Sequence, residues 1–393
     1  MTSPDVVVIG AGAVGAACAF FAARAGLRVR VLERGQIAGG TSSACEGNLL
    51  VSDKEAGPEL DLALHSQRVW REELAAFGSL WEFESKGGLV VSPSPLGAAA
   101  LTQLTRRQRA AGIEVTNVDP SDLADYEPHL KPGMAGAAFY PQDAQVQPML
   151  LTAHLLRLAR ELGAVVSTST EVTGFEIIDG RVRAVQTSGG PIAAGEVINA
   201  AGTWAGQIAR LAGVELPVLP RRGFVLVTEP LPLTVRHKVY AADYVAAVAS
   251  SDQALQTSPV IEGTRSGTVL IGSSRERVGF DSRVSLPVLS RLAQEAIALF
   301  PMLAGVRVLR SYHGFRPYCP DHLPVIGADP GVSGLWHATG HEGAGIGLSV
   351  GTAKLLVQQL LGAVTDLDLA PFSPARFTVP PSVAPPREAH AIA

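Results

Sequence analysis

A glycine-rich segment near the N-terminus constrains the fold more than any other feature of the sequence. The short β-branched run Val6–Ile9 predicts a strand, and the small, apolar residues 13–25 predict a helix that packs on a sheet. Residues 28–32 then predict a second strand, which ends at Glu33. A strand, a helix and a second strand in this order indicate the start of a parallel α/β sheet.

Three glycines between the first strand and the helix carry a specific mechanism. Gly10, Gly12 and Gly15 satisfy the spacing G-x-G-x-x-G. The first allows a tight turn, the second lets a pyrophosphate approach the backbone, and the third lets helix and strand pack closely. Glu33 is placed to accept hydrogen bonds from ribose hydroxyls. The alternative is a glycine-rich turn in an unrelated α/β protein. The order of strand, glycines, helix, second strand and acid favours a dinucleotide site instead.

The composition favours small-molecule chemistry. A chain of 393 residues, 47% of them apolar, can bury a substantial core in one large domain or two. The 32 Lys and Arg residues against 36 Asp and Glu residues give a formal net charge of -4. This balance argues against a nucleic-acid partner.

Cysteine usage and the apolar runs indicate a cytoplasmic protein. Cys18, Cys45 and Cys319 are widely spaced and form no C-x-x-C pair, so neither a disulfide framework nor a metal site is predicted. Pro4 and Asp5 stand where a secretory signal would carry basic residues. The sequence has no run of about 18 uncharged apolar residues, so it predicts no transmembrane segment.

A loop rich in glycine and hydroxyl groups follows the second predicted strand. Residues 39–43 read GGTSS, and residues 45–48 read CEGN. In many FAD enzymes of this architecture, such a loop lies along the pyrophosphate and the flavin edge. The alternative is an ordinary loop that caps a helix N-terminus, and this stretch alone does not decide between the two.

The middle of the chain returns to the nucleotide-binding pattern. Residues 152–164 have apolar side chains at helical spacing, and Asp179-Gly180 predicts a turn between two strands. Residues 196–205, EVINAAGTWA, predict a buried strand that runs into a turn of small residues. This piece resembles the strand of two-dinucleotide-type flavoproteins in which small residues let the chain pass close to the FAD pyrophosphate.

The segments between these pieces have a different pattern. They contain strand pairs such as VIEGTRSGTVLIGSS, in which a turn at residues 265–267 joins two alternating runs. The expected fold class is α/β, with a Rossmann-like FAD-binding domain of the two-dinucleotide-binding type and an inserted antiparallel-sheet α+β substrate domain. We assign residues 1–85, 145–215 and 315–370 to the FAD-binding domain and residues 86–144 and 216–314 to the substrate domain. Residues 371–393 are Pro- and Ala-rich, which predicts an extended or disordered tail.

A second glycine-rich turn lies near the C-terminus. The stretch TGHEGAGIGLS, residues 339–349, predicts a turn and then a helix from about Gly345 onward. A helix N-terminus presents unpaired N–H groups and partial positive charge. These suit the negative charge that a reduced flavin develops at its N1 and C2 carbonyl edge.

Together these motifs carry a family resemblance over roughly residues 5–365. The N-terminal fingerprint, AAGTWA, GFRP followed by PD and PVIG, and TGHEGAGIGLS resemble the superfamily of D-amino-acid oxidase, glycine oxidase and sarcosine oxidase. Within it, ACEGNLLVSDKEAGPELDLALHS and GHEGAGIGLS look most like the flavin subunit of D-hydroxyproline dehydrogenase. The related flavin subunits of opine oxidase and hydrogen cyanide synthase are similar to it.

The resemblance implies a flavoprotein dehydrogenase with non-covalent FAD that oxidises the Cα–N bond of a D-amino or imino acid by hydride transfer. The substrate expected first is cis-4-hydroxy-D-proline, oxidised to the pyrroline carboxylate. A glycine- or sarcosine-type oxidase and an opine oxidase flavin subunit stay open. The resemblance also implies a hetero-oligomer with iron–sulfur or second small subunits, and through such partners a peripheral membrane association. A flavin monooxygenase and a non-catalytic FAD-binding assembly subunit are alternatives from other classes.

Arg316 is the first candidate for substrate binding. A guanidinium cannot lose its charge, so burying it beside Gly314 and Pro317 is costly unless an anion meets it. In the glycine oxidase pattern G-[LF]-R-P, the arginine pairs with the substrate carboxylate, and the resemblance gives this role to Arg316. Two parallel hydrogen bonds would then aim the substrate Cα–H at the flavin. The alternative is that Arg316 pairs with a protein carboxylate, Asp321 or Glu262.

Other titratable residues have weaker assignments. His341, Tyr318 and Glu262 are the remaining catalytic candidates, and His313 and Glu342 are further titratable groups near the motif. Each also has a structural interpretation, because a histidine or tyrosine of this kind is often a hydrogen-bonded core residue. Hydride transfer from Cα requires no strong protein base, so no general base is assigned.

The residues expected to contact FAD come from the glycine fingerprint, the end of the second strand, the hydroxyl-rich loop, the strands of the middle section and the C-terminal motifs. They are Gly10, Gly12, Ala13, Val14, Gly15, Glu33, Arg34, Thr41, Ser42, Ser43, Glu46, Gly47, Asn48, Val172, Ala200, Ala201, Gly202, Gly314, Glu342, Gly343, Ala344, Gly345, Ile346 and Gly347.

A covalent flavin is not expected. Monomeric sarcosine oxidases attach FAD through a cysteine just before the arginine motif, and counting back from Pro320 places Gly314 at that position. Cys45 and Cys319 are then small packed thiols rather than nucleophiles. Three cysteines are also too few for an iron–sulfur cluster in this chain, so a cluster must come from a partner.

Overall fold

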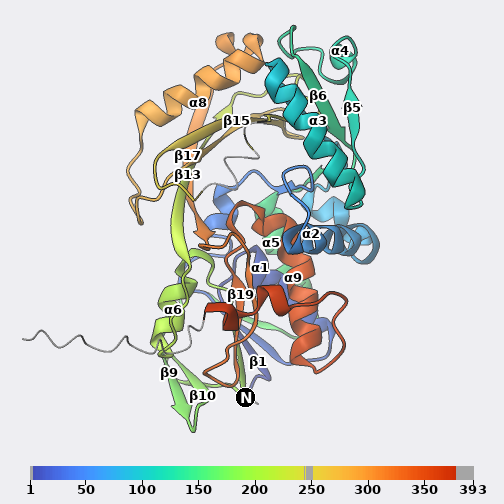
Figure 1. Cartoon of the computed structure of the whole chain (residues 1–393). Coiled ribbons are helices and arrows are strands. Elements are labelled where there is room, and N and C mark those ends of the chain that lie inside the picture. The colour runs from blue at the N-terminus through green and yellow to red at the C-terminus, as the bar shows by residue number, and fades with distance from the viewer. Residues whose placement is uncertain (1–2, 243, 245–250, 378–393) are drawn as a thin grey trace, which may run out of the picture.

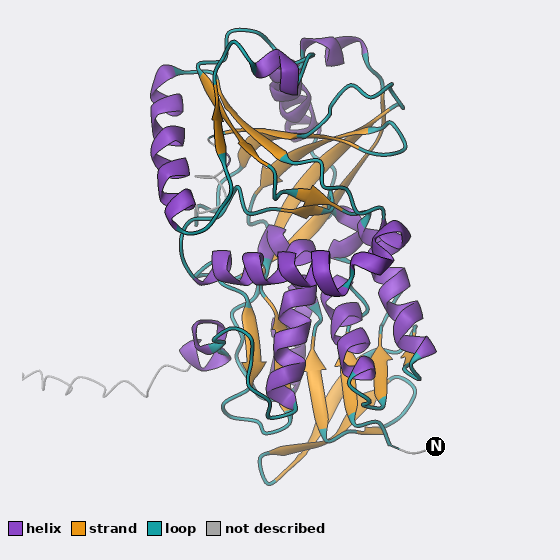
Figure 2. Ribbon diagram, turned by 90° about the vertical axis from the view of Figure 1, so that its right-hand side faces the viewer, coloured by secondary structure: helices purple, strands orange, loops and turns teal. Residues whose placement is uncertain are grey.

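The computed structural model describes residues 3–242, 244 and 251–377. Two sheets dominate them, a six-stranded sheet in the lower half of Figure 1 and an eight-stranded sheet in the upper half. The turned view in Figure 2 shows helices between the two groups of strands. The predicted fold class, α/β with a second and largely antiparallel sheet, is confirmed.

The six-stranded sheet carries the N-terminal motif at its centre. Its strands run in the order β18 (Val325–Ala328), β19 (Leu335–Thr339), β12 (Glu196–Asn199), β1 (Val6–Ile9), β2 (Val29–Leu32) and β8 (Val165–Ser167). All neighbours pair in parallel except β18 and β19. The first and second predicted strands are confirmed to within one residue, because β-branched residues suit a strand that is buried on both faces.

Small side chains let three long helices pack closely over this sheet. α1 (Ala13–Arg24) contacts both α9 (Gly345–Leu360) and α5 (Pro148–Glu161). Almost every side chain of α1 is buried, as its sequence AVGAACAFFAAR requires. The helix predicted at residues 152–164 begins earlier, because the Gln147 side chain caps its N-terminus and proline occupies the first helical position.

The eight-stranded sheet is the second large sheet of the molecule. Its order is β17 (Val308–Tyr318), β13 (Leu219–Thr228), β16 (Val269–Arg275), β15 (Gln256–Gly263), β14 (Lys238–Ala241), β4 (Gly88–Ser92), β6 (Gly136–Tyr140) and β5 (Thr116–Val118). Only β14 and β4 pair in parallel, so the sheet is not wholly antiparallel. α8 (Leu286–Leu299) and α3 (Pro95–Ala110) accompany this sheet in Figure 1.

Both predicted hairpin turns are present. β15 and β16 pair on either side of residues 264–268, and Gly267 has a φ of +84°, which favours glycine. Asp179 and Gly180 have φ values of +51° and +71° between β9 (Val172–Ile178) and β10 (Arg181–Thr187). Two left-handed residues in succession are typical of a tight hairpin turn.

The remaining elements complete the described part of the chain. They are the paired strands β3 (Asn48–Leu49) and β7 (Ala144–Gln145), β11 (Ile192–Ala193), the α-helices α2 (Pro58–Arg68), α4 (Leu123–Tyr126) and α6 (Ala205–Leu211), the π-helical turn η2 (Val69–Glu73), and the 3-10 turns η1 (Thr41–Ala44), η3 (Ala75–Trp81), η4 (Gly202–Trp204), η5 (Pro301–Gly305), η6 (Glu342–Ala344), η7 (Ala370–Phe372) and η8 (Pro374–Phe377).

The start of the predicted tail is packed rather than extended. All of residues 371–377 except Ser373 lie in η7 or η8, and Phe372 is completely buried. Arg376 binds the Asp321 carboxylate, with Nε 2.6 Å from Oδ2. The prediction was therefore wrong for these residues, because a buried aromatic side chain and an ion pair with the segment between β17 and β18 hold them against the rest of the protein. Residues 378–393 lie outside the described part of the chain.

Two further observations concern the sequence predictions. β17 is one continuous strand, so it crosses the boundary predicted between residues 314 and 315. Among the described residues, no helix is both long enough and apolar enough to span a bilayer.

Candidate active site

A cavity of about 650 Å³ is lined from both sheets. One side comes from the turn between β1 and α1, the loop at residues 39–50 and the end of β12. The other side comes from β13, β14 and β17, and the turn before α9 closes it. Segments that are far apart in the sequence therefore meet at the carboxyl ends of the parallel strands, where α/β sheets bind their ligands.

The glycine fingerprint is built as its spacing predicts. Gly10 has a φ of +105°, and a Cβ atom there would lie 2.6 Å from the Ala200 carbonyl oxygen. A Cβ atom on Gly15 would lie 2.0 Å from the Gly10 carbonyl oxygen. The N-terminus of α1 has Gly12 as its N-cap and no side-chain cap. Its N–H groups and partial positive charge therefore suit a phosphate.

Glu33 holds this turn together. Its Oε2 accepts a hydrogen bond from the backbone N–H of Ala11 over 2.9 Å, and its Oε1 accepts one from Gly35 over 2.8 Å. Glu33 also lines the cavity, beside Arg34. The Glu33 carboxylate thus stabilises the backbone of this turn, in addition to the role toward ribose that the sequence predicts.

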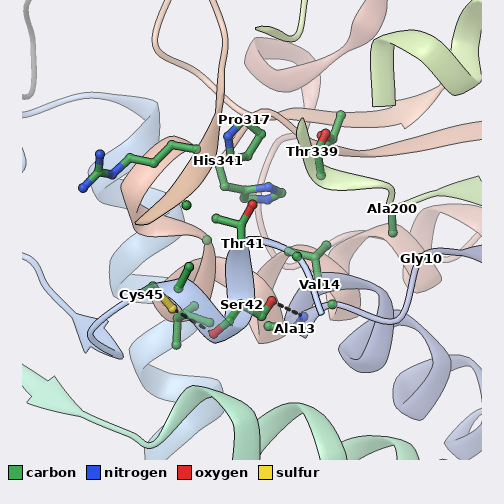
Figure 3. Close-up of a pocket in the computed structure, with 18 of the residues that line it drawn as sticks. Gly10, Ala13, Val14, Thr41, Ser42, Cys45, Ala200, Pro317, Thr339 and His341 are labelled. Carbon is green, nitrogen blue, oxygen red and sulfur yellow. Dashed lines mark hydrogen bonds between the residues drawn. The ribbon is translucent and has the colours of Figure 1, made fainter. Parts of the chain in front are cut away.

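The hydroxyl-rich loop joins the two walls of the cavity. Thr41 Oγ1 donates a hydrogen bond to the Phe315 carbonyl over 2.6 Å, and Ser42 Oγ accepts one from Ala13 N over 2.9 Å. Figure 3 shows Ser42 between Ala13 and Cys45, whose thiol approaches the Ser42 carbonyl to 3.2 Å. The two interpretations of this loop are compatible, because Ser42 meets a helix N-terminus while the loop lines the cavity.

Close packing requires glycine at two other predicted positions. A Cβ atom on Gly47 would lie 1.9 Å from the Val146 carbonyl oxygen, and one on Gly314 would lie 2.6 Å from the Cβ atom of Ala44. A cysteine at position 314 would collide with the hydroxyl-rich loop. This close approach supports a flavin that is not attached to β17.

The part of the cavity beside Arg34 is aromatic and positively charged. The Arg34 guanidinium lies 4.4 Å from the Trp204 ring centroid, and Phe280 stacks against Trp204 with centroids 5.5 Å apart. Arg34, Val172 and Trp204 all line the cavity. Trp204 was named in the AAGTWA motif but not predicted to contact a ligand, because the small residues before it carried the pyrophosphate argument.

Arg316 lies on the cavity wall. Its Nη1 donates a hydrogen bond to the Ser274 carbonyl over 2.8 Å, and no carboxylate among the described residues is within ion-pair distance of it. Burial and the guanidinium of Arg275 lower the pKa of Arg316 to about 10, which leaves it charged at neutral pH. The two alternative partners are engaged elsewhere, since Asp321 binds Arg376 and Glu262 binds Lys86. The structure therefore contradicts the alternative in which a protein carboxylate neutralises Arg316.

A second arginine stands directly opposite Arg316 on the neighbouring strand. Arg221 is completely buried, and its Nη1 lies 3.2 Å from Oε2 of Glu342. His322 Nδ1 lies 2.9 Å from the other oxygen of Glu342. Glu342 lines the cavity with a left-handed φ of +46°. This network fixes the turn before α9, and the single sequence could not reveal Arg221 because it lies 121 residues from Glu342.

His341 is a buried, neutral residue. It is 3% exposed, its Nε2 lies 2.9 Å from Thr352 Oγ1, and burial lowers its pKa to about 3. It lines the cavity, and Figure 3 places it near Thr41 and Pro317. At neutral pH it can donate or accept a hydrogen bond but carries no proton to give as an imidazolium.

Two catalytic candidates lie away from the cavity wall. Tyr318 is 2% exposed and packs beneath the guanidinium groups of Arg221 and Arg277. Glu262 is 1% exposed, and the nearest cation, Lys86, lies 3.3 Å away. Neither lines the cavity, so direct contact with a substrate is not supported for them. Their structural interpretations, a core tyrosine and a buried ion pair, fit the geometry.

Most predicted cofactor residues do line the cavity. Of that set, Gly15 and Ser43 do not. Gly15 performs the packing role predicted for it, while Ser43 Oγ donates a hydrogen bond to the Gly40 carbonyl over 3.1 Å. The sequence analysis assigned no ligand contact to several charged and polar lining residues, some inside the quoted motifs and some outside them: Gln36, Asp53, Lys54, Gln67, Gln207, Lys238, Tyr244 and Thr339.

The residues around the cavity fit FAD. The N-terminus of α1, whose Ala13 N–H is already bonded to Ser42, and the glycine turn would hold the pyrophosphate, and Glu33 would hold a ribose. η6 and the N-terminus of α9, which has no side-chain cap, would face the flavin end. The buried Oδ1 of Asn48 has no hydrogen-bond partner among the described residues, which suits a polar ligand beside this loop.

The chain is similar in sequence and in fold to known proteins. A family model described as FAD dependent oxidoreductase matches residues 5–359. Glycine oxidase of Pseudomonas putida is 31% identical over 387 residues, which cover 95% of this chain and 98% of that protein. Hydrogen cyanide synthase subunit HcnC of Pseudomonas aeruginosa is 28% identical, with 96% of this chain and 97% of HcnC covered. The crystal structure of glycine oxidase from Geobacillus kaustophilus has a TM-score of 0.86 and 28% identity, covering 95% of this chain and 99% of its own.

Proposed function

The chain belongs to the family of FAD-dependent oxidoreductases, and from that premise we propose that it oxidises the Cα–N bond of a small amino or imino acid. One observation carries this proposal. Arg316 lies on the cavity wall, and no carboxylate among the described residues is within ion-pair distance of it. A substrate carboxylate is the anion that a planar fork of donors fits best.

The residues of the chain would bind, orient and enclose the substrate. Arg316 would hold the carboxylate at two points and thereby fix the direction of the Cα–H bond. Bound FAD supplies the two-electron redox chemistry. The N-terminus of α9 offers N–H groups and partial positive charge beside the cavity, and the neutral His341 adds no competing charge. No protein base is needed for this assignment.

We place cis-4-hydroxy-D-proline first among the substrates, with the pyrroline carboxylate as its product. The resemblance of residues 44–66 to the flavin subunit of D-hydroxyproline dehydrogenase supports this choice. The 31% identity to glycine oxidase favours glycine or sarcosine as the second candidate. An opine is the third, on the same motif resemblance as the first.

We further propose that the electrons leave through a partner protein in the cytoplasm. The similarity to the hydrogen cyanide synthase subunit HcnC supports a flavin subunit that works with others. The three free cysteines of the chain are too far apart in sequence to suggest a cluster of its own, so iron–sulfur or second small subunits would take the electrons. Peripheral membrane association would then depend on those partners.

Anaerobic mixing of the purified flavoprotein with a panel of D-amino and imino acids tests the proposed function. We expect the flavin absorbance to bleach with at least one acid that carries a free carboxylate, and not with the matching amide. Bleaching by NADPH alone would indicate a monooxygenase, and no bleaching by any acid would indicate an assembly subunit. Either result would overturn the proposal.

Steady-state assays test the partner. We expect an artificial dye to accept electrons much faster than O₂ does. Equal rates with dye and with O₂ would contradict the partner and favour a free-standing oxidase.

A further inference from the structure

Lys238 is a buried cation for which the oxidation itself gives no role. It is 2% exposed, and its Nζ has no hydrogen-bond partner among the described residues. It nevertheless lines the same cavity as Arg316. A buried ammonium group is costly unless an acceptor reaches it, so this position points to an oxygen atom from outside the protein.

The carboxylates nearest to Lys238 are engaged by other groups. Glu262 stands directly opposite on the neighbouring strand, but its close cation is Lys86, at 3.3 Å. Asp143 accepts hydrogen bonds from both the backbone N–H and the hydroxyl of Ser52. Both carboxylates are near enough for their charges to interact with Lys238, but neither lies within ion-pair distance of it, and Lys238 lines the cavity.

Aromatic rings connect Lys238 to the rest of the substrate site. Its Nζ lies 5.6 Å from the ring centroid of Tyr240 and 5.8 Å from that of Tyr244. The Tyr244 ring is also 4.6 Å from Cζ of Arg275, and burial lowers the pKa of Arg316 while the Tyr244 phenol acts to raise it. Tyr244 is thus a neighbour of both cationic ends of the site.

The sheet arranges three charged groups in order across one face. Arg316 is on β17, Lys238 is on β14, and β13, β16 and β15 lie between them. Glu46 rests on the middle of these strands, because a Cβ atom on Gly272 of β16 would lie 2.0 Å from Glu46 Oε1. That oxygen is buried and has no hydrogen-bond partner among the described residues. Read across the sheet, the order is cation, carboxylate, cation.

We propose that Lys238 binds a second oxygen of the substrate, distal to its nitrogen, while Arg316 holds the α-carboxylate and Glu46 faces the amine. This inference rests on the proposed function. It makes Lys238 a specificity-determining residue and defines the substrate as an amino or imino acid with an additional oxygen acceptor. The acceptor is the hydroxyl of a hydroxyproline or the second carboxylate of an imino diacid, and matched substrates distinguish the two.

Two pairs of substrates test the role of Lys238. cis-4-Hydroxy-D-proline and D-proline differ in the hydroxyl, and iminodiacetate and sarcosine differ in the second carboxylate. We expect the wild-type protein to prefer the oxygen-bearing member of at least one pair in kcat/KM with an artificial acceptor. Lys238→Met should reduce that preference by roughly 10- to 100-fold, as for loss of one charged hydrogen bond.

Lys131→Met is the control, because Lys131 is exposed and does not line the cavity. It should leave the preference at the wild-type value. Replacing an unpartnered buried charge by an apolar side chain of similar length should also preserve the fold of Lys238→Met.

Binding of unreactive acids supplies a readout that does not depend on turnover. Succinate, 4-hydroxybutyrate and butyrate are titrated against the flavin absorbance of the holoprotein. We expect succinate or 4-hydroxybutyrate to bind more tightly than butyrate in wild type, and this advantage to disappear in Lys238→Met. If substrates are oxidised but the preference is the same in both proteins, the role of Lys238 is overturned and the proposed function stands. If no member of either pair, nor any other amino or imino acid, bleaches the flavin, the proposed function itself fails.

Discussion

Gly223 leaves room for Arg316: a Cβ atom on Gly223 would lie 2.2 Å from Nη1 of Arg316. The two residues lie on adjacent strands, β13 and β17, whose register puts Gly223 opposite Gly314. The Ser274 carbonyl then accepts a hydrogen bond from Nη1 over 2.8 Å. The guanidinium is therefore positioned by the backbone before any ligand arrives, which lowers the ordering cost of binding.

Arg316→Lys tests the carboxylate role of this arginine. An ammonium group is a point charge and cannot reproduce a two-point fork, so FAD should be retained while turnover falls. The expected loss is on the order of 2 to 5 kcal/mol, or about 30- to 4000-fold in kcat/KM. The measurement compares a substrate acid with its amide in both proteins, and the wild-type preference for the acid should shrink in the variant.

Arg310→Lys is the control, because Arg310 is exposed on the same strand and does not line the cavity. If the ratio of kcat/KM for the acid to that for the amide is identical in wild type and Arg316→Lys, the carboxylate assignment is contradicted, even if the overall rate drops.

The flavin should be released by denaturation. Gly314 has no side chain to form a link, and burial raises the pKa of the Cys45 thiol to about 12, so little thiolate is present. Precipitation with acid should leave yellow colour and FAD absorbance in the supernatant, and Cys45→Ser should behave in the same way. Colour that stays in the pellet of wild type would contradict this prediction.

Glu33→Ala should weaken both FAD retention and the folded state. The substitution removes the ribose acceptor and leaves the backbone N–H groups of Ala11 and Gly35 without their partner. Each lost acceptor costs about 1–3 kcal/mol when the donor is buried, and less when water can replace it. Dialysis against FAD-free buffer measures retention, and thermal unfolding of the apoprotein measures stability.

Glu176→Ala, an exposed change on β9, should alter neither quantity. Wild-type FAD affinity in Glu33→Ala would show that the carboxylate serves only the backbone.

His341 should make the protein sensitive to acid. Its pKa is about 3 in the folded state, against an ordinary value of 6.5, because burial disfavours the charged form. Between these two values the unfolded chain binds the additional proton, so stability falls as the pH drops below about 6.5. At pH 5 the contribution lost is about 2 kcal/mol.

His341→Gln removes this titration and still allows a hydrogen bond to Thr352. The fall in Tm of the holoprotein from pH 7 to pH 5 should therefore be smaller in the variant than in wild type. The exposed His129 provides the control, since His129→Gln should keep the wild-type pH dependence. The same fall in Tm for wild type and His341→Gln would refute the assignment of the acid sensitivity to this residue.

Local patterns predicted the parts of the site that are made by one continuous segment. β1, α1 and β2 appear within one residue of the bounds read from the sequence, because their residues are neighbours in both sequence and space. The helix at Gly345 was predicted from its glycine-rich turn for the same reason. Tyr318 was chosen because strand alternation puts it on the same face as Arg316, and Glu262 because it is titratable, but neither lines the cavity.

The sequence by itself determined that the chain folds around a dinucleotide, since the glycine spacing, the helix and the acid at position 33 are all local requirements of that turn. It also singled out Arg316 as a charge in need of an anion. Only the tertiary structure decided which charges remain unmatched, because Arg376 reaches Asp321 from 55 residues away and Lys86 reaches Glu262 from the strand region of β4. Ion pairing depends on distances across sheets. Arg316 and Lys238 line one cavity because of the order of the strands in the sheet, and no run of consecutive residues shows this.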